Sequence, residues 1–229
     1  MSNLQDELKT LFIAYKIDKY YEDNTSPRTY LGLSQIGHSC PLYLWLCHNK
    51  YKQISIHGQT LRLFEHGNKV EDWIISDLLK VGYRVYGQQR EVMFEDKEIK
   101  LYGHIDGIIE GLEESFKPHL LECKSANDKK FHELIKLNSY EAWNEGYKTQ
   151  IQVYMLGLEL ERCLAIVYNK NTSEIYSERI KLDKSYAIQK LEHVFNILAN
   201  PKPENKCPRA DWWEAKFCGF YNECFGTPN

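Results

Sequence analysis

Apolar residues recur every three or four positions over residues 3–21 and again over residues 58–81, which is the spacing of an amphipathic helix. Gly82 directly follows the second pattern and marks its end, because glycine commonly terminates helices. Between the two patterns, Ser34 is a typical helix N-cap and predicts a third helix that runs to about Asn49. The first third of the chain is therefore expected to be helical.

From residue 83 onward apolar residues alternate with polar ones, and this period of two is typical of strands. The pattern predicts three strands, the first from residues 83–86 and 91–94, the second over residues 99–109 and the third over residues 119–124. The polar segment 111–114 is a natural turn, so we expect the second and third strands to form a hairpin.

The second half of the chain returns to mixed patterns. They predict helices over residues 128–137 and 139–160, strands over residues 163–169 and 174–182, and a helix capped by Asp183 that runs to about residue 198. This order predicts a mixed α/β layer structure. No repeat or linker interrupts it, so residues 1–229 are expected to form a single domain, with residues 201–229 as a cysteine-bearing C-terminal appendage.

Composition narrows the class of protein. The chain has 229 residues, 43% hydrophobic and 27% charged, a balance typical of a globular domain. Its net charge of −3 is unusual for a protein that neutralises many phosphates, although an acidic metal site offsets basic patches. No apolar run approaches the roughly 20 residues of a membrane span, and a signal peptide is not recognisable. We expect a cytoplasmic protein with no membrane partner, whose seven cysteines bind metal, catalyse or lie buried.

Two acidic residues and a lysine are prominent in the predicted hairpin. Asp106 lies in its first strand and Glu122-Cys123-Lys124 ends its second. Because side chains alternate along a strand, Glu122 and Lys124 share one face, while Cys123 packs into the core. Hairpin pairing brings Asp106 beside Glu122, and two carboxylates so close repel unless a cation lies between them. Oxygen ligands favour Mg²⁺, which activates water, and Lys124 would orient that water or neutralise developing charge.

A structural alternative exists for each of these residues. A Glu-x-Lys pair is common on exposed strands, so Glu122 and Lys124 alone would be interpreted as a surface ion pair, with an unrelated Asp106 in a turn. The apolar residues before Glu122 and the Gly-x-x-Asp-Gly segment one strand earlier favour the catalytic interpretation.

Asp106 followed by Glu122-Cys123-Lys124 resembles the signature of the PD-(D/E)XK nuclease superfamily. The resemblance implies a restriction-endonuclease-like core over residues 25–200, in which helices flank a central mixed β-sheet. It also implies hydrolysis of phosphodiester bonds with Mg²⁺ or Mn²⁺, held by the two carboxylates.

Gln150 and Tyr154 match the Gln-x-x-x-Tyr motif of the RecB-like branch of that superfamily. This branch includes nuclease domains of bacterial recombination helicases, CRISPR-adaptation exonucleases and many phage exonucleases. The resemblance implies that both residues, one helical turn apart, contact the substrate strand or the catalytic lysine. The alternative is that Tyr154 lies in the core and Gln150 at the surface.

The family also has an earlier metal ligand on a helix. Glu71, four residues after Gly67, fits the form found in phage-type members, and His66 and Asp72 are its rivals. A solvated helix face is the alternative interpretation. His104 lies two positions from the hairpin aspartate and is left out of the catalytic set.

Cys40 together with Cys207, Cys218 and Cys224 resembles the iron–sulfur clasp of several RecB-like nucleases. The resemblance implies that four thiolates hold a 4Fe–4S cluster and join the C-terminal appendage to Cys40. The chain departs from the family at Ala215, which stands where the family's pattern has a cysteine. The identity of the metal is therefore open at this stage.

Two other interpretations of the cysteines remain. Four thiolates suit a tetrahedral zinc ion, and His38 could replace one of them. Alternatively the cysteines bind no metal and are simply buried. Cys47, Cys123 and Cys163 lie in apolar patterns, so we expect them in the core.

The sequence as a whole favours an exonuclease acting on single-stranded DNA or duplex ends. Such an enzyme would serve recombination, repair or phage DNA processing in a bacterial or phage-infected cell, with recombination or replication proteins as partners. Four lysines near the predicted site could line a groove for the DNA backbone: Lys129, Lys130, Lys136 and Lys148. The alternative function is a non-catalytic accessory protein that binds nucleic acid on a nuclease fold.

Overall fold

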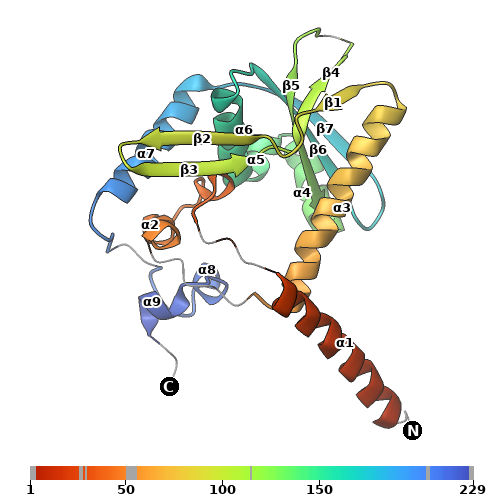
Figure 1. Ribbon diagram of the computed structural model, residues 1–229, viewed down its shortest axis with the longest axis vertical. Helices are drawn as coiled ribbons and strands as arrows, with labels where there is room; N and C mark the ends of the chain where they lie inside the picture. The colour runs from red at the N-terminus through yellow and green to blue at the C-terminus, as the bar shows by residue number, and fades with distance from the viewer. Residues whose placement is uncertain are drawn as a thin grey trace.

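The computed structural model of the chain describes residues 4–25, 28, 30–49, 56–113, 115–204 and 207–226. None of the helices found there has the length and apolar character needed to cross a membrane. Figure 1 shows a β-sheet with helices on both sides, a long N-terminal helix that leaves the body, and a C-terminal segment of two short helices.

The central sheet has the strand order β1-β4-β5-β6-β7. Its strands are β1 (Arg84–Tyr86), β4 (Gly107–Glu110), β5 (His119–Ala126), β6 (Arg162–Asn169) and β7 (Ile175–Lys181). Strands β5 and β6 run parallel, while the other neighbours run antiparallel. The predicted mixed sheet is therefore confirmed, and so is the antiparallel pairing that places the segment before residue 111 beside β5.

A second, two-stranded sheet consists of β2 (Glu91–Asp96) and β3 (Ile99–His104). The prediction of one strand over residues 99–109 is wrong, because the chain turns from this small sheet into the central sheet at Ile105 and Asp106. Backbone hydrogen bonding continues just past the ends of β2 and β3, since the Ile105 N–H donates to the Arg90 carbonyl at 3.1 Å. Apolar residues continue to alternate across the turn, so the sequence pattern contains no break there.

Helix α3 (Gly58–Lys80) covers one face of the central sheet, where Val70, Ile74 and Ile75 pack with Leu121 and other side chains of the sheet. The opposite face carries most of the remaining helices, and their buried residues form the larger core. These helices are α2 (Pro41–Asn49), α4 (Asp128–Leu137), α5 (Tyr140–Trp143), α6 (Glu145–Gly157) and α7 (Lys184–Ala199). Strand β5 is thus buried on both faces.

The predicted helix from Ser34 to Asn49 is wrong at its start. A short 3-10 helix, η1 (Leu33–Gln35), is followed by a loop, and α2 begins only at Pro41, which fits the first position of a helix because it lacks an N–H. Gly37 in the loop passes close to α6: a Cβ there would lie 2.8 Å from the Gly146 Cα. This close approach leaves no room for a side chain at position 37.

The predicted helix over residues 139–160 is divided into α5 and α6. Asn144 interrupts it with an extended backbone, at φ −154° and ψ 114°, and its side chain accepts a hydrogen bond from the Tyr147 N–H at 3.0 Å. Asn144 therefore caps a new helix. Asp183 caps α7 in the same manner, as predicted, by accepting from the Tyr186 N–H at 3.0 Å.

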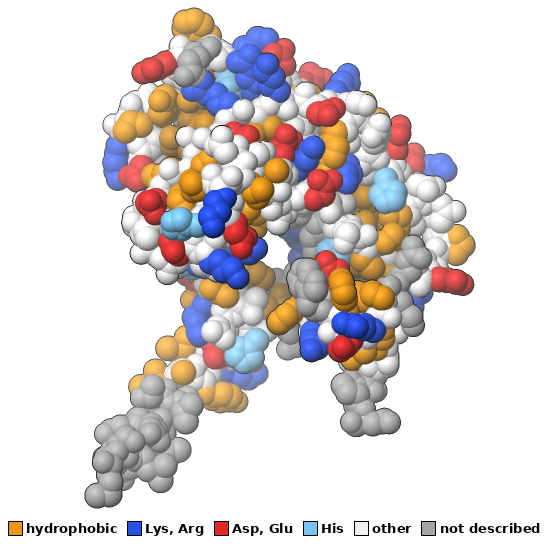
Figure 2. Space-filling model, turned by 180° about the vertical axis from the view of Figure 1, so that it is seen from behind, with side chains coloured by type: hydrophobic (Ala, Val, Ile, Leu, Met, Phe, Trp, Pro, Cys, Tyr) orange, Lys and Arg blue, Asp and Glu red, His pale blue; other side chains and the backbone are white. Residues whose placement is uncertain are grey.

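The two ends of the chain lie outside the layered body. Helix α1 (Leu4–Asn24) contacts α3, and the Glu22 carboxylate accepts from the Gly58 N–H at 3.0 Å. Several large apolar side chains on α1 are 44–65% exposed, and they follow the helix outward in Figure 2: Phe12, Ile13, Tyr15, Ile17 and Tyr20. The C-terminal helices α8 (Trp213–Lys216) and α9 (Tyr221–Phe225) lie near α2, where the Phe220 and Tyr43 rings are 5.7 Å apart.

Candidate active site

The site is built on strand β5, which carries Glu122 and Lys124 on one face, as the alternation of side chains predicts. This face points toward α6, and Leu120 lies on it within the larger core. Cys123 points toward α3 and is 7% exposed. Glu122 is fully buried, and its carboxylate forms an ion pair with the Lys124 ammonium, whose side chain is 22% exposed. A buried charged pair of this kind is costly to desolvate, so it calls for further partners.

Helix α6 supplies such a partner through Gln150. The Gln150 side-chain amide donates to both Glu122 oxygens, at 2.9 and 3.2 Å. Gln150 is itself only 6% exposed, so the alternative that it lies at the surface is excluded. Two donors, one charged and one neutral, therefore fix the orientation of the Glu122 carboxylate.

Asp106 reaches the same region from the turn between β3 and β4. Register places Gly107 opposite Leu121, and the Asp106 Oδ2 atom accepts a hydrogen bond from the Cys123 N–H at 2.7 Å. The carboxylate is thereby held at β5, beside Glu122 in the neighbouring position. The turn that the sequence pattern does not reveal is what directs Asp106 to this place.

Tyr154 lies one helical turn beyond Gln150 and is 2% exposed. A Cβ on Gly103 of β3 would lie 2.5 Å from the Tyr154 hydroxyl oxygen, so only glycine fits opposite this side chain. Burial, followed by the Glu122 charge, raises the pKa of Tyr154. Tyr154 thus packs between α6 and the small sheet, within the field of the carboxylates.

Glu71 on α3 approaches the site from the other face of the sheet. Burial and then the Asp106 charge raise the pKa of Glu71 to about 7, and Gln89 donates to its carboxylate at 3.4 Å. Its rivals differ: Asp72 is exposed, and the His66 ring makes an edge contact with Trp73. Among the three candidates, Glu71 is the one whose charge interacts with Asp106.

The charges of the site act on one another strongly. Burial raises the pKa of Glu122; Lys124 opposes this, while Asp106 and Glu71 add to it. Burial lowers the pKa of Lys124, but the Glu122 and Asp106 carboxylates outweigh it and raise the pKa overall. Three acids against one lysine leave an excess of negative charge, which a divalent cation would balance.

The donor set suits Mg²⁺ or Mn²⁺, since Glu71, Asp106 and Glu122 offer hard oxygen ligands. Their oxygens are not gathered tightly, however. Among the described residues, the only group of three such side chains with ligand atoms all within 4.8 Å of one another lies elsewhere. The three carboxylates would therefore need side-chain rotation to share one ion.

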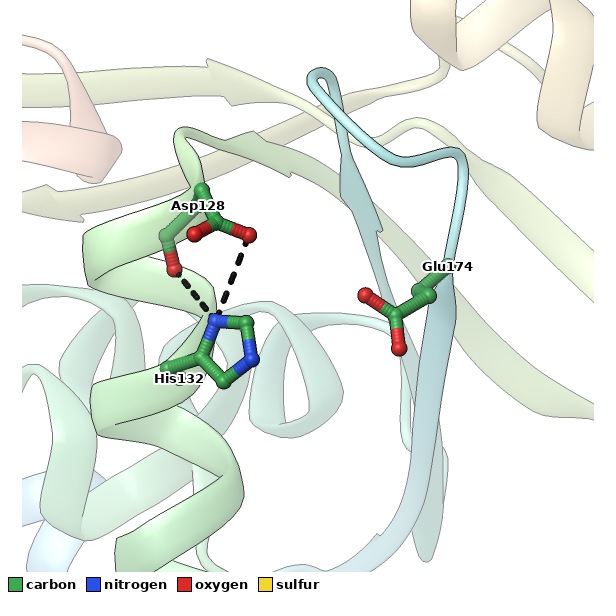
Figure 3. Close-up of side chains that lie close together, drawn as sticks. All are labelled: Asp128, His132 and Glu174. Atoms are coloured by element: carbon green, nitrogen blue, oxygen red, sulfur yellow. Dashed lines mark hydrogen bonds and ion pairs between the residues drawn. The ribbon is translucent and has the colours of Figure 1, made fainter.

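That other group consists of Asp128, His132 and Glu174, and Figure 3 shows the first two on α4 and the third at the turn before β7. All three are exposed, and their contacts have structural explanations. The His132 Nδ1 atom lies 2.9 Å from the Asp128 carbonyl oxygen, and the buried Asn169 donates to the Asp128 carboxylate at 3.0 Å. These contacts secure the start of α4 against the β6–β7 turn, so the group is not part of the candidate site.

The sequence reasoning missed a cluster of three aromatic residues, one of which contacts Lys124. Its Nζ atom lies 5.5 Å from the Tyr147 ring centroid, a cation–π distance. Tyr140 stacks on Tyr147 at 5.9 Å, and Trp143 lies 5.5 Å from the same ring. A helical spacing of i, i+3 and i+7 ahead of Gln150 is the signal that could have identified these residues.

The cysteines predicted to form the clasp lie between α2 and the C-terminal helices. Backbone N–H groups approach two of the sulfur atoms at 3.4 Å, from Tyr43 to Cys40 and from Phe220 to Cys218. Burial and then Cys40 raise the pKa of Cys207, so these two thiols are close. No three of the sulfurs from Cys40, Cys207, Cys218 and Cys224 lie within 4.8 Å of one another.

Two details bear on the other cysteine predictions. The His38 Nδ1 atom accepts a hydrogen bond from the Cys40 N–H at 3.0 Å and is thereby occupied. Cys47, Cys123 and Cys163 are at most 7% exposed, so their predicted place in the core is confirmed.

No model of a known protein family matches the chain, and no curated protein matches its sequence. The fold is nevertheless similar to solved structures. The protein SSO0001 aligns with a TM-score of 0.55 at 18% identity, over 96% of this chain and 98% of its own. An alkaline exonuclease, LHK-Exo from Laribacter hongkongensis, aligns with a TM-score of 0.52 at 15% identity, over 79% of this chain and 91% of its own. Its complex with dAMP aligns with a TM-score of 0.50 at 15% identity, over 81% and 91%. The chain therefore shares the fold of a nuclease, a central mixed sheet flanked by helices.

Proposed function

We propose that this chain is a divalent-metal-dependent DNA exonuclease of the PD-(D/E)XK type. The observation that carries the proposal is the buried Glu122–Lys124 pair, which Gln150 orients and which lies beside Asp106. A buried acid and lysine stabilise a fold poorly, so the arrangement is better explained by chemistry than by stability. The fold shared with an alkaline exonuclease is consistent with this function.

Each residue has a role in the proposed mechanism. Glu71, Asp106 and Glu122 would hold Mg²⁺ or Mn²⁺, which when bound makes water a stronger nucleophile at neutral pH. The Lys124 ammonium would donate a hydrogen bond to the attacking water, or would stabilise the negative charge that develops on the phosphate. Gln150 keeps Glu122 in orientation, and Tyr154 supports α6 against β3.

The proposed substrate is DNA, single-stranded or at duplex ends, in recombination, repair or phage DNA processing. The structurally similar exonuclease LHK-Exo has been observed in complex with dAMP, which is consistent with a nucleic-acid substrate. The aromatic rings of Trp143 and Tyr147 beside Lys124 are suited to stack on a base.

We further propose that the C-terminal segment is a clasp that holds a 4Fe–4S cluster with Cys40, Cys207, Cys218 and Cys224. A single tetrahedral zinc ion would bring its thiolate sulfurs to about 3.8 Å from one another. No three of these sulfurs lie within 4.8 Å of one another, so a single zinc ion would require the thiolates to move closer together, whereas in a cluster each thiolate binds a different iron. N–H groups directed at two of the sulfurs also support it, since such hydrogen bonds are a feature of cluster sites. Protein purified without oxygen should be brown and contain iron; a colourless preparation that contains zinc would contradict this.

The nuclease proposal is tested with the variant Glu122→Ala and its shape-conserving counterpart Glu122→Gln. Labelled linear DNA, single- and double-stranded, and closed circular DNA are incubated with Mn²⁺ or Mg²⁺ and sampled over time. We expect wild type to degrade linear DNA from its ends, while both variants fold and fail to cleave.

The matched control is Glu133→Ala, an acid on α4 paired with Lys130 and away from the site. It should cleave as wild type does. Undiminished cleavage by folded Glu122→Gln would overturn the assignment, and a wild type that binds DNA but never cleaves it would favour the accessory-protein function instead.

A further inference from the structure

Tyr140, the first residue of α5, carries a hydroxyl group that is fully buried and has no hydrogen-bond partner among the described residues. Its backbone is well satisfied, since the Tyr140 N–H donates to the Glu178 carboxylate at 2.6 Å. An unpaired buried hydroxyl lowers the stability of the fold, and phenylalanine would fill the same space without that loss. The oxygen therefore requires an explanation other than packing.

The surroundings of the hydroxyl point to the candidate site. The Tyr140 ring stacks on Tyr147, over whose ring the Lys124 ammonium lies. After burial, the Glu122 charge has the largest effect on the pKa of Tyr140, and it raises that pKa. The Tyr140 side chain thus lies near enough to Glu122 for the carboxylate charge to act on it, and the Tyr147 ring links it to Lys124.

The hydrogen bonds now made by Glu122 leave room for another donor. Lys124 and Gln150 both approach its Oε1 atom, whereas its Oε2 atom has only the longer contact with Gln150, at 3.2 Å. A carboxylate accepts about four hydrogen bonds, and binding a cation would reorient it. Hydrogen bonds of catalytic groups often become short only in the loaded state of a site.

We propose that Tyr140 is a positioning residue whose hydroxyl donates to the Glu122 carboxylate, directly or through one water, when a divalent cation is bound. The inference rests on the proposed function and deepens it. It adds a third donor to the shell that fixes Glu122, next to Lys124 and Gln150. Groups that donate hydrogen bonds to a metal ligand, without binding the metal themselves, affect metal affinity about as strongly as some ligands do.

The test is the variant Tyr140→Phe, which removes the oxygen and keeps the ring. Mn²⁺ binding is titrated calorimetrically without DNA, and thermal unfolding is followed with EDTA and with Mn²⁺. We expect the dissociation constant for Mn²⁺ to rise about tenfold or more. Unfolding in EDTA should be unchanged or shifted to higher temperature, because the hydroxyl has no partner in that state.

Two comparison variants make the result specific. Tyr168→Phe also removes one hydroxyl, which donates to Ser173 at 2.7 Å away from the site, and it should leave Mn²⁺ binding unchanged. Gln150→Ala removes an observed donor to Glu122 and should weaken Mn²⁺ binding to a similar degree as Tyr140→Phe.

The outcomes separate this inference from the function on which it rests. If wild type binds Mn²⁺ and cleaves DNA while Tyr140→Phe binds Mn²⁺ within twofold of wild type, the inference fails alone. If wild type neither binds Mn²⁺ nor cleaves, the proposed function fails and the inference with it. Should Tyr140→Phe not fold, 3-fluorotyrosine at position 140 gives a second readout: its ¹⁹F resonance should shift on addition of Mg²⁺, and an unmoved resonance overturns the inference.

Discussion

The carboxylate site on β5 and the cysteine segment at the C-terminus are held in place in opposite ways. Both carboxylate oxygens of Glu122 have partners: Lys124 on the same strand forms an ion pair with one, and Gln150 on α6 donates to both. The cysteine segment has two short helices and lies against α2, with Ala215 and Phe220 as its buried apolar residues in the described part. The first region is shaped by the fold, while the second is a segment that a bound metal would have to shape.

Because the two regions are held differently, substitutions in them should have different consequences. Removing one side chain from a packed site leaves its neighbours in place, so the loss is chemical and local. Removing a ligand from a metal-organised segment releases the whole segment, because the binding energy is its folding energy. Substitutions in each region test whether the effect is local or extends to a whole segment.

Apart from the Glu122 variants, Lys124→Met should have the largest effect on catalysis. Glu122 would keep only Gln150 as a partner and take up a proton at neutral pH, so both charges of the pair are lost. We expect cleavage to slow by about a hundred- to a thousandfold, as when one donor to developing charge is removed. Rates measured on end-labelled DNA check this, with Lys80→Met as control, because Lys80 is an exposed lysine paired with Asp77 in the last turn of α3.

Gln150→Ala should come next, and the chain provides a matched control in Gln152→Ala on the same helix. Gln150 donates to a charged group, a bond worth roughly 1.5–3 kcal/mol, so cleavage should fall about ten- to a hundredfold. Gln152 bonds instead to Glu141 and to the Lys181 carbonyl, and its loss should lower stability but not the rate. Equal rates for the two variants would remove Gln150 from the site.

Cys218→Ser tests the other region. Loss of a cluster ligand should release residues after about 200, so that limited proteolysis there becomes at least about tenfold faster while the core stays protected. Iron content should fall with it, and DNA cleavage should change less than in either site variant. Cys163→Ser, a core substitution, is the control that should leave iron content intact. Unaltered proteolysis of Cys218→Ser would mean that the segment is held by packing alone.

The smallest effect concerns pH. The pKa of Glu71 is raised to about 7 in the folded protein, so its ionised form is disfavoured there relative to the unfolded chain. Without divalent metal, this acid should lower the free energy of unfolding by on the order of 1 kcal/mol as the pH rises from 5 to 8, after allowance for solvent screening. Urea unfolding in EDTA measures it. Glu71→Gln should flatten the dependence, and Mn²⁺ binding should tighten over the same range.

Much of the fold follows from the sequence because the patterns are local. The alternation of side chains places Glu122 and Lys124 on one face of β5, and the polar segment of the sequence after β4 indicates the antiparallel pairing of the two strands. The pattern does not show where the chain leaves the small sheet and enters the central sheet. The turn at Asp106 follows Ile105, whose backbone is hydrogen-bonded to Gln89 and Arg90 in an earlier segment, and it leaves no trace in hydrophobic periodicity.

The site is less predictable than the fold for the same reason. Glu71 differs from Asp72 by its burial against the far side of the sheet, which helical spacing alone cannot establish. Tyr140 would be assigned to the core by its chemistry, and it does lie in the core, but its unpaired oxygen is visible only in three dimensions. The charged residues of the site can be identified from residue type and spacing. The neutral residues around them can be identified only from the packed structure.

The parallel pairing of β5 and β6 has a consequence for protein synthesis. Asp106, Glu122 and Lys124 leave the ribosome well before β6 (Arg162–Asn169), yet β6 is the strand that pairs with β5 along its whole length from Leu120 to Ala126. Parallel strands need a crossover between them, here formed by α4, α5 and α6, so their pairing cannot begin until that crossover has emerged. A nascent or truncated chain that ends before β6 therefore contains the charged residues without the strand that encloses them, and the proposed activity would require chains that extend past β6.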